Sequence, residues 1–190
     1  MQVQIVEEKM DALLRYAFVP IAFRVESRYR LEPIDGGPGG IRLVEESVAP
    51  YDKDYDSIPG EAPSDWATRW NVSTWGFFGA WSGRLRVGGA AVATGTAAVE
   101  TCHGREDVAV LRDLRVQREY RRQGVGKSLF GAAADWARDR QYRALIVETQ
   151  NVNVPACRFY ARQGCELAAI DSTAYPPEME EVRLLWILGL

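Results

Sequence analysis

The alternation of apolar and polar residues predicts a chain built mainly of short strands. Residues 23–31 and 41–48 alternate in this way, and the glycine-rich turn at 36–40 between them predicts a hairpin. Further strands are predicted where apolar residues alternate or form short runs: 3–6, 74–81, 86–94 with a continuation at 97–102, 108–116, 144–148, 166–171 and 181–188. The run at 144–148 is almost wholly apolar, which is typical of a strand covered on both faces.

Three stretches show helical spacing of apolar residues instead: 9–17, 124–140 and 155–163. The apolar positions of the first are Met10, Leu13, Leu14 and Ala17, and Pro20 closes it. The expected buried face of the second is Leu129, Phe130, Ala133, Trp136 and Ala137. The third has Asn153 as a plausible N-cap and Gly164 at its end. Strands and helices alternate in the second half of the chain, which predicts a mixed α/β fold.

Residues 51–63 are rich in Asp, Tyr, Pro and Gly, which predicts a mobile surface loop. Its carboxylates are Asp52, Asp54, Asp56 and Glu61. Acidic runs of this kind are usually solvated, and a part in substrate binding is the alternative. Trp66 and Trp70 follow at positions i and i+4 of a short helical turn, where they are expected in the core or in a pocket wall.

Composition narrows the classes of protein to consider. The 190 residues, 47% apolar and 26% charged, form most simply one globular domain. The net charge of −3 argues against a general nucleic-acid binder. Three cysteines without a Cys-x-x-Cys pair indicate neither a disulfide framework nor a zinc cage, so no metal is expected. Because His103 is the only histidine, a Ser-His or Cys-His hydrolase is nearly excluded.

The hydropathy of the chain also bears on its location. No apolar run reaches the ~20 residues that a membrane span needs, and the first residues lack the apolar segment of a signal peptide. We therefore expect a cytoplasmic protein that has no membrane partner. A homodimer stays open as its oligomeric state.

A basic turn follows the strand at 108–116 and leads into the helix at 124–140. Gly124, Val125 and Gly126 begin that helix, where free N–H groups and the helix dipole favour an anion. The cations around this turn are Arg112, Arg115, Arg118, Arg121, Arg122 and Lys127. A Walker A loop would need glycine at 121, and a dinucleotide fingerprint would need glycine at 129. The remaining pattern, Arg-x-x-Gly-x-Gly at 121–126, predicts a polyphosphate site, with a solvated turn that caps an ordinary helix as the alternative.

A second motif follows that helix: Glu-Thr-Gln-Asn-Val-Asn-Val-Pro-Ala-Cys-Arg-Phe-Tyr at 148–160. Together the two motifs resemble the GNAT superfamily of acyl-CoA N-acyltransferases over about residues 75–190. The residues of the second motif, and the segment Ile-Asp-Ser-Thr-Ala-Tyr at 170–175, are most similar to the corresponding sequences of the streptothricin acetyltransferases. Cys165 departs from that pattern, because it stands where the family usually has Phe, and 182–186 matches only loosely. These departures concern the substrate more than the chemistry.

The resemblance implies a GNAT fold, an α/β (α+β) domain whose mixed central sheet has splayed parallel strands flanked by helices. Residues 1–72 would form an N-terminal part with the hairpin and the acidic loop, and residues 73–190 an acetyl-CoA-binding core within the single domain 1–190.

The resemblance also assigns the contacts to acetyl-CoA. The pantetheine arm would bond the strand backbone at Leu114, Arg115 and Val116. The pyrophosphate would be held by the segment Arg121, Arg122, Gln123, Gly124, Val125, Gly126 and Lys127, with the hydroxyl of Ser128 added. The further cofactor contacts would be Asn151, Asn153 and Phe159. For the two asparagines, capping of the helix that follows is the alternative.

The resemblance further implies that a free amine attacks the thioester directly. Tyr160 matches the tyrosine that protonates the leaving thiolate, with a core tyrosine as the alternative. A lysine-like amine of pKa about 10.4 costs on the order of 4–5 kcal/mol to deprotonate at pH 7, so a base or a water relay is needed. Asp113 and Glu148 are the candidate bases, and each could instead be a structural ion-pair partner of an arginine. The backbone at 114–116 would bind the oxyanion.

Taken together, the motifs predict an N-acetyltransferase for a small cationic amine such as a streptothricin-type antibiotic, and hence a part in antibiotic resistance. The candidates for its acceptor pocket are Asp171, Tyr175, Glu148 and the 52–61 loop. An acetyltransferase for a peptide N-terminus or lysine is one alternative, because ribosomal-protein acetyltransferases carry a strand similar to 148–150. A non-catalytic acyl-CoA sensor is another.

Overall fold

The computed structural model describes residues 3–95 and 105–190. They group into two compact units, one formed by Met1–Ala22, Asp54–Val147 and Ile187–Leu190 and the other by Phe23–Lys53 and Glu148–Trp186. The strand continuation predicted at 97–102 lies outside the described residues. In the described part of the chain no helix is both long and apolar enough to span a membrane.

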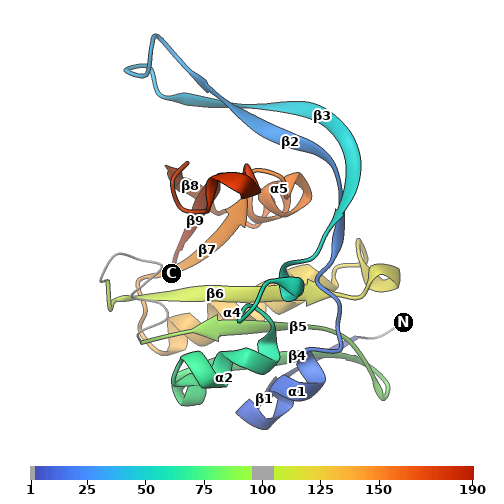
Figure 1. Ribbon diagram of the computed structural model, residues 1–190. Helices are drawn as coiled ribbons and strands as arrows, with labels where there is room; N and C mark the ends of the chain where they lie inside the picture. The colour runs from blue at the N-terminus through green and yellow to red at the C-terminus, as the bar shows by residue number, and fades with distance from the viewer. Residues whose placement is uncertain (1–2, 96–104) are drawn as a thin grey trace. The chain divides into compact units, whose positions relative to one another are not determined.

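The sheet of the first unit is mixed (Figure 1). Its antiparallel strands follow the order β1 (Gln4–Glu8), β4 (Gly76–Ser82), β5 (Leu85–Ala93) and β6 (Val108–Val116). The N-terminal half of β7 (Ala144–Gln150) then pairs with β6 in parallel. The helix α4 (Val125–Asp139) makes that parallel connection, as crossovers between parallel strands usually do. The predicted mixed α/β fold is confirmed.

A β-bulge lies where the two parallel strands part. The pairs of β5 with β6 skip Arg112, because Ala91 pairs with Asp113 and Val92 with Leu111. The parallel ladder between β6 and β7 also ends at this level, with the pair Leu111 and Val147. An extra residue bends its strand and breaks the ladder locally. The bulge in the β5–β6 pairing and the last pair of the β6–β7 ladder therefore fall at the same level of β6.

Helix α4 packs against β4, β5 and β6. Its buried residues are Val125, Leu129, Phe130, Ala133, Ala134, Trp136 and Ala137, which include all five positions predicted from the helical spacing. The spacing was informative here because one face of a long helix covers the sheet.

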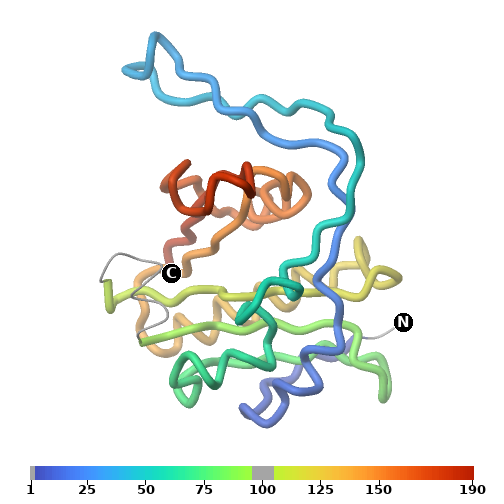
Figure 2. Tube along the Cα trace, in the orientation of Figure 1, coloured from blue at the N-terminus to red at the C-terminus, as the bar shows by residue number. Residues whose placement is uncertain are grey.

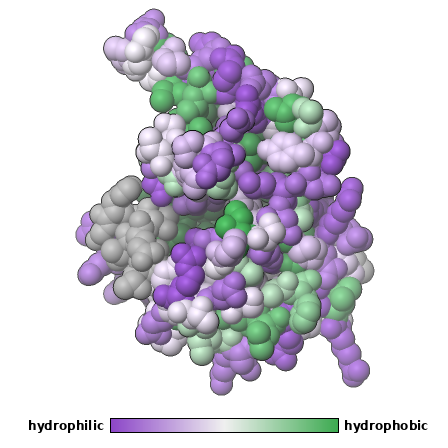
Figure 3. All heavy atoms as spheres, viewed as in Figure 1, coloured by the Kyte–Doolittle hydropathy of each residue, from purple (hydrophilic) through white to green (hydrophobic). Residues whose placement is uncertain are grey.

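The N-terminal helix differs from its prediction. The chain forms a 3₁₀ turn, η1 (Met10–Ala12), and one short helix, α1 (Leu13–Tyr16). Its buried side chains are Ala12, Leu13 and Tyr16, whereas Met10 and Leu14 are exposed. Hydrophobic atoms are accordingly visible on the surface around α1 (Figure 3). The predicted apolar face was wrong for Met10 and Leu14, because Tyr16 fills the space against the sheet.

The segment predicted as a mobile surface loop contains short regular elements, with turns and bends between them. Its first three residues complete β3 (Ile41–Lys53), and η2 (Tyr55–Ser57) follows. After it come η3 (Pro63–Asp65), α2 (Trp66–Arg69) and η4 (Val72–Thr74). Trp66 is buried, and its ring lies 6.0 Å from that of Tyr16 and 5.8 Å from that of Trp75. Trp66 is therefore a core residue, which was one of the two alternatives predicted for it.

The second unit contains the predicted hairpin and the rest of β7. Strands β2 (Phe23–Pro33) and β3 are antiparallel and stay side by side along their length (Figure 2). Beside β7 lie β9 (Arg183–Gly189) and then β8 (Glu166–Asp171). Helix α5 (Val154–Arg162) follows β7 with Asn153 as its N-cap, and η6 (Pro177–Met179) precedes β9. The predicted cap is confirmed, because Asn153 Oδ1 accepts the Ala156 N–H at 3.2 Å.

Candidate active site

The predicted anion loop lies at the start of α4 in the first unit. Gly124 is the N-cap residue with φ of +85°, and no side chain caps the helix. The first backbone bond of the helix runs from the Ser128 N–H to the Gly124 carbonyl at 3.0 Å. The amides of Val125, Gly126 and Lys127 therefore have no acceptor within the helix. Because a side chain rarely adopts this φ, glycine is the favoured residue at 124 in the turn that exposes these amides.

The cations around the loop divide into two groups. Arg121 donates to the carbonyls of Val116 (2.9 Å) and Ala22 (3.2 Å), and burial lowers the pKa of its guanidinium. It therefore braces the turn against the end of β6. Arg122 and Lys127 are exposed beside the free amides, and Ser128 is exposed one residue further on. These exposed side chains and amides together suit a compact anion with several negative charges.

Strand β6 offers a second feature of the site in its backbone. Leu114 and Val116 pair with Ala90 and Gly88 of β5 on one side. On the other side the ladder with β7 ends at Leu111. The backbone groups of residues 112–116 that point away from β5 are thus not used by a β7 ladder. Such groups can bond the amides of an extended ligand.

Asp113, a candidate base, is instead part of a buried ion pair. Its side chain is 4% exposed and that of Arg115 is 1% exposed. Asp113 Oδ1 accepts from the Tyr16 hydroxyl (2.6 Å) and from Arg115 Nε (3.0 Å), and Oδ2 accepts from Arg115 Nη2. Burial and the charge of Asp113 raise the pKa of Tyr16 well above its usual value. These contacts favour the structural alternative for Asp113.

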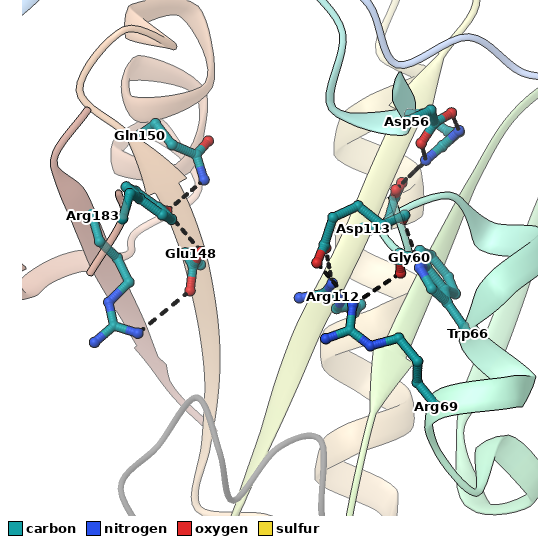
Figure 4. A network of polar contacts seen from close by, with 12 residues as sticks. Asp56, Gly60, Trp66, Arg69, Arg112, Asp113, Glu148, Gln150 and Arg183 are labelled. Carbon is teal, nitrogen blue, oxygen red and sulfur yellow. Dashed lines mark hydrogen bonds and ion pairs between the residues drawn. The ribbon is translucent and has the colours of Figure 1, made fainter. Parts of the chain in front are cut away.

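Two arginines of β6 bind the acidic segment at 54–61 (Figure 4). Arg115 forms two bonds with Asp56, at 2.7 and 3.1 Å, and also donates to the Val19 carbonyl. Arg112 pairs with Glu61, and its guanidinium lies 4.9 Å from the Trp70 ring. The segment is therefore fastened to the strand by its own carboxylates. Asp56 and Glu61 are already paired, which leaves them less suited to an acceptor cation.

Glu148, the other candidate base, lies in a polar cluster of the second unit (Figure 4). Its Oε1 accepts from the Tyr175 hydroxyl at 2.8 Å, and that hydroxyl accepts from Gln150 Nε2 at 2.8 Å. Arg183 Nη1 lies 3.9 Å from Glu148 Oε2. The Glu148 side chain is 27% exposed, in contrast to that of Asp113. Of the two carboxylates, Glu148 has the access to solvent that a base needs.

Asp171 belongs to the same cluster. Its Oδ1 accepts from the backbone and the hydroxyl of Thr173, each at 2.8 Å, and Oδ2 accepts from Arg183 at 2.8 Å. The backbone N–H of Thr173 is the main reason that the pKa of Asp171 lies below its usual value. Arg183 therefore links Asp171 and Glu148, and brings both predicted pocket carboxylates and Tyr175 into one cluster.

The two candidate asparagines have internal partners. Asn151 is buried, and its Nδ2 donates to the Tyr29 carbonyl while its Oδ1 accepts the Val182 N–H, each at 2.9 Å. It therefore ties β2 and the start of β9 to the end of β7. Asn153 caps α5. These contacts favour a structural role for both side chains, and their contact with the cofactor stays a prediction.

Tyr160 lies on α5 and is 7% exposed. Its ring meets that of Phe159 edge to face, with the centroids 5.1 Å apart. Phe159 is only partly buried. A phenol that is nearly buried on a helix fits either the predicted acid or the core alternative, so its role stays a prediction.

Sequence reasoning missed several members of these clusters. Gln150 could have been found, because alternate residues of a strand share a face and it stands two positions after Glu148. Arg183 carried no such signal, because its position relative to β7 depends on pairing between strands far apart in the chain. The same holds for the bond between Arg115 and Asp56, which are separated by 59 residues.

Comparison with known proteins identifies the family to which the chain belongs. The model of the acetyltransferase (GNAT) family matches residues 42–165. Streptothricin acetyltransferase of Escherichia coli is 32% identical over 150 residues, which cover 77% of this chain and 75% of that protein. Streptothricin acetyltransferase A of Bacillus subtilis (strain 168) is 35% identical over 80 residues, 41% of this chain. That match spans 46% of the B. subtilis protein, less than half its length.

Solved structures share the fold. The crystal structure of a protein from Bacillus anthracis str. Ames, in complex with acetyl coenzyme A, superimposes on this chain with a TM-score of 0.77. The two proteins are 24% identical, and the match covers the whole of both chains. This likeness shows that the fold of the chain is that of a known class of protein. The chain belongs to the GNAT acetyltransferase family.

Proposed function

We propose that this protein is an acetyl-CoA-dependent N-acetyltransferase that acts on a primary amine of a small cationic molecule, of the streptothricin type. Membership of the GNAT family and the similarity to streptothricin acetyltransferases support the reaction class. The acetyl coenzyme A bound by the B. anthracis relative supports the choice of acyl donor.

The observation that carries the proposal is the uncapped start of α4. Three consecutive amides lack helical acceptors, and Gly124 leaves open space in front of them, since a Cβ there would meet no atom within 4 Å. These amides, with Arg122 and Lys127, bind the pyrophosphate of the acyl donor. Fixed backbone donors suit so compact a charge better than flexible side chains do. The backbone groups of residues 114–116 that point away from β5 bind the pantetheine amides.

In the proposed reaction the acceptor nitrogen forms a bond with the thioester carbon, and the carbon–sulfur bond breaks. Glu148 takes the proton that the ammonium group must lose before its lone pair can attack. Tyr160 gives a proton to the leaving thiolate, whose usual pKa near 8.5 is close enough to that of a phenol for the transfer. The second proton that the acceptor nitrogen loses as the amide forms restores the Tyr160 hydroxyl. Amides of β6 stabilise the oxyanion between these steps.

The acceptor class follows from charge and from the relatives. Asp171 and Glu148 are the carboxylates of the cluster, and Arg183 neutralises only part of their charge. A cationic amine is attracted to such a site, whereas an anionic acceptor is repelled.

Release of free CoA from acetyl-CoA tests the proposal, with streptothricin, spermidine and a lysine peptide as acceptors. We expect turnover with streptothricin above the other two.

The variant Gly124→Glu should remove CoA binding, because a like charge about 4 Å from the phosphates costs about 4 kcal/mol, or ~1,000-fold in affinity. Isothermal titration with CoA measures that loss.

Gly124→Ala is the matched control. It meets the same positive φ, at a cost of about 1–2 kcal/mol in stability, but adds no charge. We expect its affinity for CoA to stay within ~3-fold of the parent, because the open space tolerates a methyl group. Unchanged affinity in Gly124→Glu would refute the loop assignment.

The acceptor assay separates the alternatives. Tight CoA binding without turnover on any of the three amines would favour an acyl-CoA sensor. Turnover of the peptide alone would favour a protein acetyltransferase.

A further inference from the structure

Tyr175 lies between two polar residues of one strand. Glu148 and Gln150 are two positions apart on β7, so their side chains share a face of the sheet. The Tyr175 hydroxyl, from the segment between β8 and η6, is 2.8 Å from Glu148 Oε1 and 2.8 Å from Gln150 Nε2. One hydroxyl therefore bridges a carboxylate and a carboxamide.

The chemistry of the three groups fixes the direction of both hydrogen bonds. The carboxylate can only accept, and a phenol has a single proton to donate. Tyr175 must give that proton to Glu148, so it can meet Gln150 only as an acceptor. The amide nitrogen of Gln150 supplies the donor. With the opposite orientation of the carboxamide, two acceptors would compete for one proton. The chain of donors thus runs from Gln150 to Tyr175 to Glu148.

We propose that Tyr175 is a positioning residue that holds the Glu148 carboxylate in place for proton transfer, with Gln150 fixing the direction of the Tyr175 hydroxyl. This inference rests on the proposed function, in which Glu148 is the base. It departs from the sequence-based expectation that Tyr175 contacts the acceptor. Its hydroxyl has one proton, and Glu148 already receives it.

The surroundings of the pair suit this role. Glu148 is 27% exposed, so part of its carboxylate stays accessible while Tyr175 holds Oε1. Arg183 lies 3.9 Å from Oε2, too far for a hydrogen bond, and is bonded to Asp171 instead. Oε2 is therefore the oxygen left to receive the proton of the acceptor amine. A glutamate that is not held would lose rotamer entropy each time it reached the reactive position.

Burial also keeps Tyr175 in its donor form. Burial and the charge of Glu148 both raise the pKa of the Tyr175 hydroxyl, so it stays protonated wherever the enzyme is assayed. Gln150 opposes this shift, since its N–H stabilises the phenolate, but it does not reverse it. The Tyr175 hydroxyl is thus available to donate to Glu148.

A double-mutant cycle on kcat separates a positioning role from a substrate contact. The four proteins are the parent, Tyr175→Phe, Glu148→Gln and the double variant, assayed with acetyl-CoA and streptothricin. Loss of a general base lowers kcat by ~100-fold in Glu148→Gln. Loss of one charge-assisted hydrogen bond lowers it by ~10-fold in Tyr175→Phe, with KM for streptothricin within ~2-fold. In the Glu148→Gln background Tyr175→Phe should change kcat by less than ~2-fold, because no base is left for the hydroxyl to position.

Two further variants control for general damage. Gln150→Met keeps Tyr175 and removes only its donor, so its loss in kcat should be smaller than that of Tyr175→Phe. Tyr142→Phe removes a hydroxyl from a tyrosine stacked on Trp136 in the other unit, and should leave kcat unchanged. Thermal melts of all variants check that each is folded.

The outcomes separate the inference from the function on which it rests. If Tyr175→Phe raises KM for streptothricin equally in both backgrounds, Tyr175 contacts the acceptor and the positioning role is wrong. If the two losses in kcat multiply in the double variant, Tyr175 acts independently of Glu148, which also contradicts it. Parent-like kcat in Glu148→Gln would instead overturn the assignment of the base.

Discussion

At the scale of single residues, the two candidate bases show why the type of residue does not determine its role. Asp113 and Glu148 are both carboxylates on central strands. Asp113 has both oxygens bonded within a buried cluster, whereas Glu148 keeps one oxygen clear of any hydrogen bond among the described contacts. Access to solvent and free bonding capacity depend on side chains from distant segments. The sequence therefore supplied two candidates, and contacts separate them.

Tyr160 gives the test at this scale. If it protonates the leaving thiolate, Tyr160→Phe removes the proton and leaves the shape of the side chain unchanged. We expect kcat to fall by ~100-fold, the usual contribution of a general acid, with the affinity for CoA nearly intact. Steady-state kinetics and titration with CoA measure the two quantities. Unfolding of the variant, seen in its circular dichroism, would favour the core alternative.

At the scale of elements, strand β6 contributes both to the central sheet and to the candidate site. Its pairing with β5 has a bulge at Arg112, its ladder with β7 ends at Leu111, and its two arginines fasten the segment at 54–61. Each of the five N–H donors of Arg115 has a partner: two bonds go to Asp113, two to Asp56 and one to Val19. The cluster therefore joins β6 to segments that precede it by more than fifty residues.

The stability of the chain should depend on this cluster. Arg115→Met leaves two carboxylates without their cation, one of them buried. Breaking a buried pair in this way costs about 3–5 kcal/mol, so the urea midpoint should fall steeply. Arg138→Met is the control, because Arg138 pairs with Asp135 at an exposed site where such pairs contribute about 0.5 kcal/mol or less. Equal effects of the two variants would contradict a stabilising role for the cluster.

The same elements show how far the sequence predicts the fold. Most of the strands and the two later helices were predicted to within a few residues, because their apolar residues recur with the period of a strand or a helix. The prediction was weaker at 10–18 and 54–74, where turns are held by contacts such as Arg115 with Asp56. Local pattern carries no information on partners of that kind. The glycine loop was predictable because its geometry needs glycine itself.

At the scale of the whole molecule, the anion site is a local exception in an acidic chain. The net charge is −3, yet six cations lie between residues 112 and 127. Three of them, Arg112, Arg115 and Arg121, are used by internal contacts. The exposed remainder, Arg118, Arg122 and Lys127, surrounds the helix start. Local rather than net charge therefore governs the binding of a polyphosphate, and moderate salt should weaken it through these exposed groups.

Binding at the helix start should stabilise the folded molecule as a whole. A ligand that binds only the native state adds about 2.7 kcal/mol at ~100 times its Kd. For a chain of this size that corresponds to a rise in Tm of roughly 5–10 °C, measured by thermal melting with CoA. Pantetheine lacks the pyrophosphate, so at equal concentration it should raise Tm by less than about 2 °C. Equal shifts with CoA and pantetheine would show that the amides of Val125, Gly126 and Lys127 do not bind the pyrophosphate.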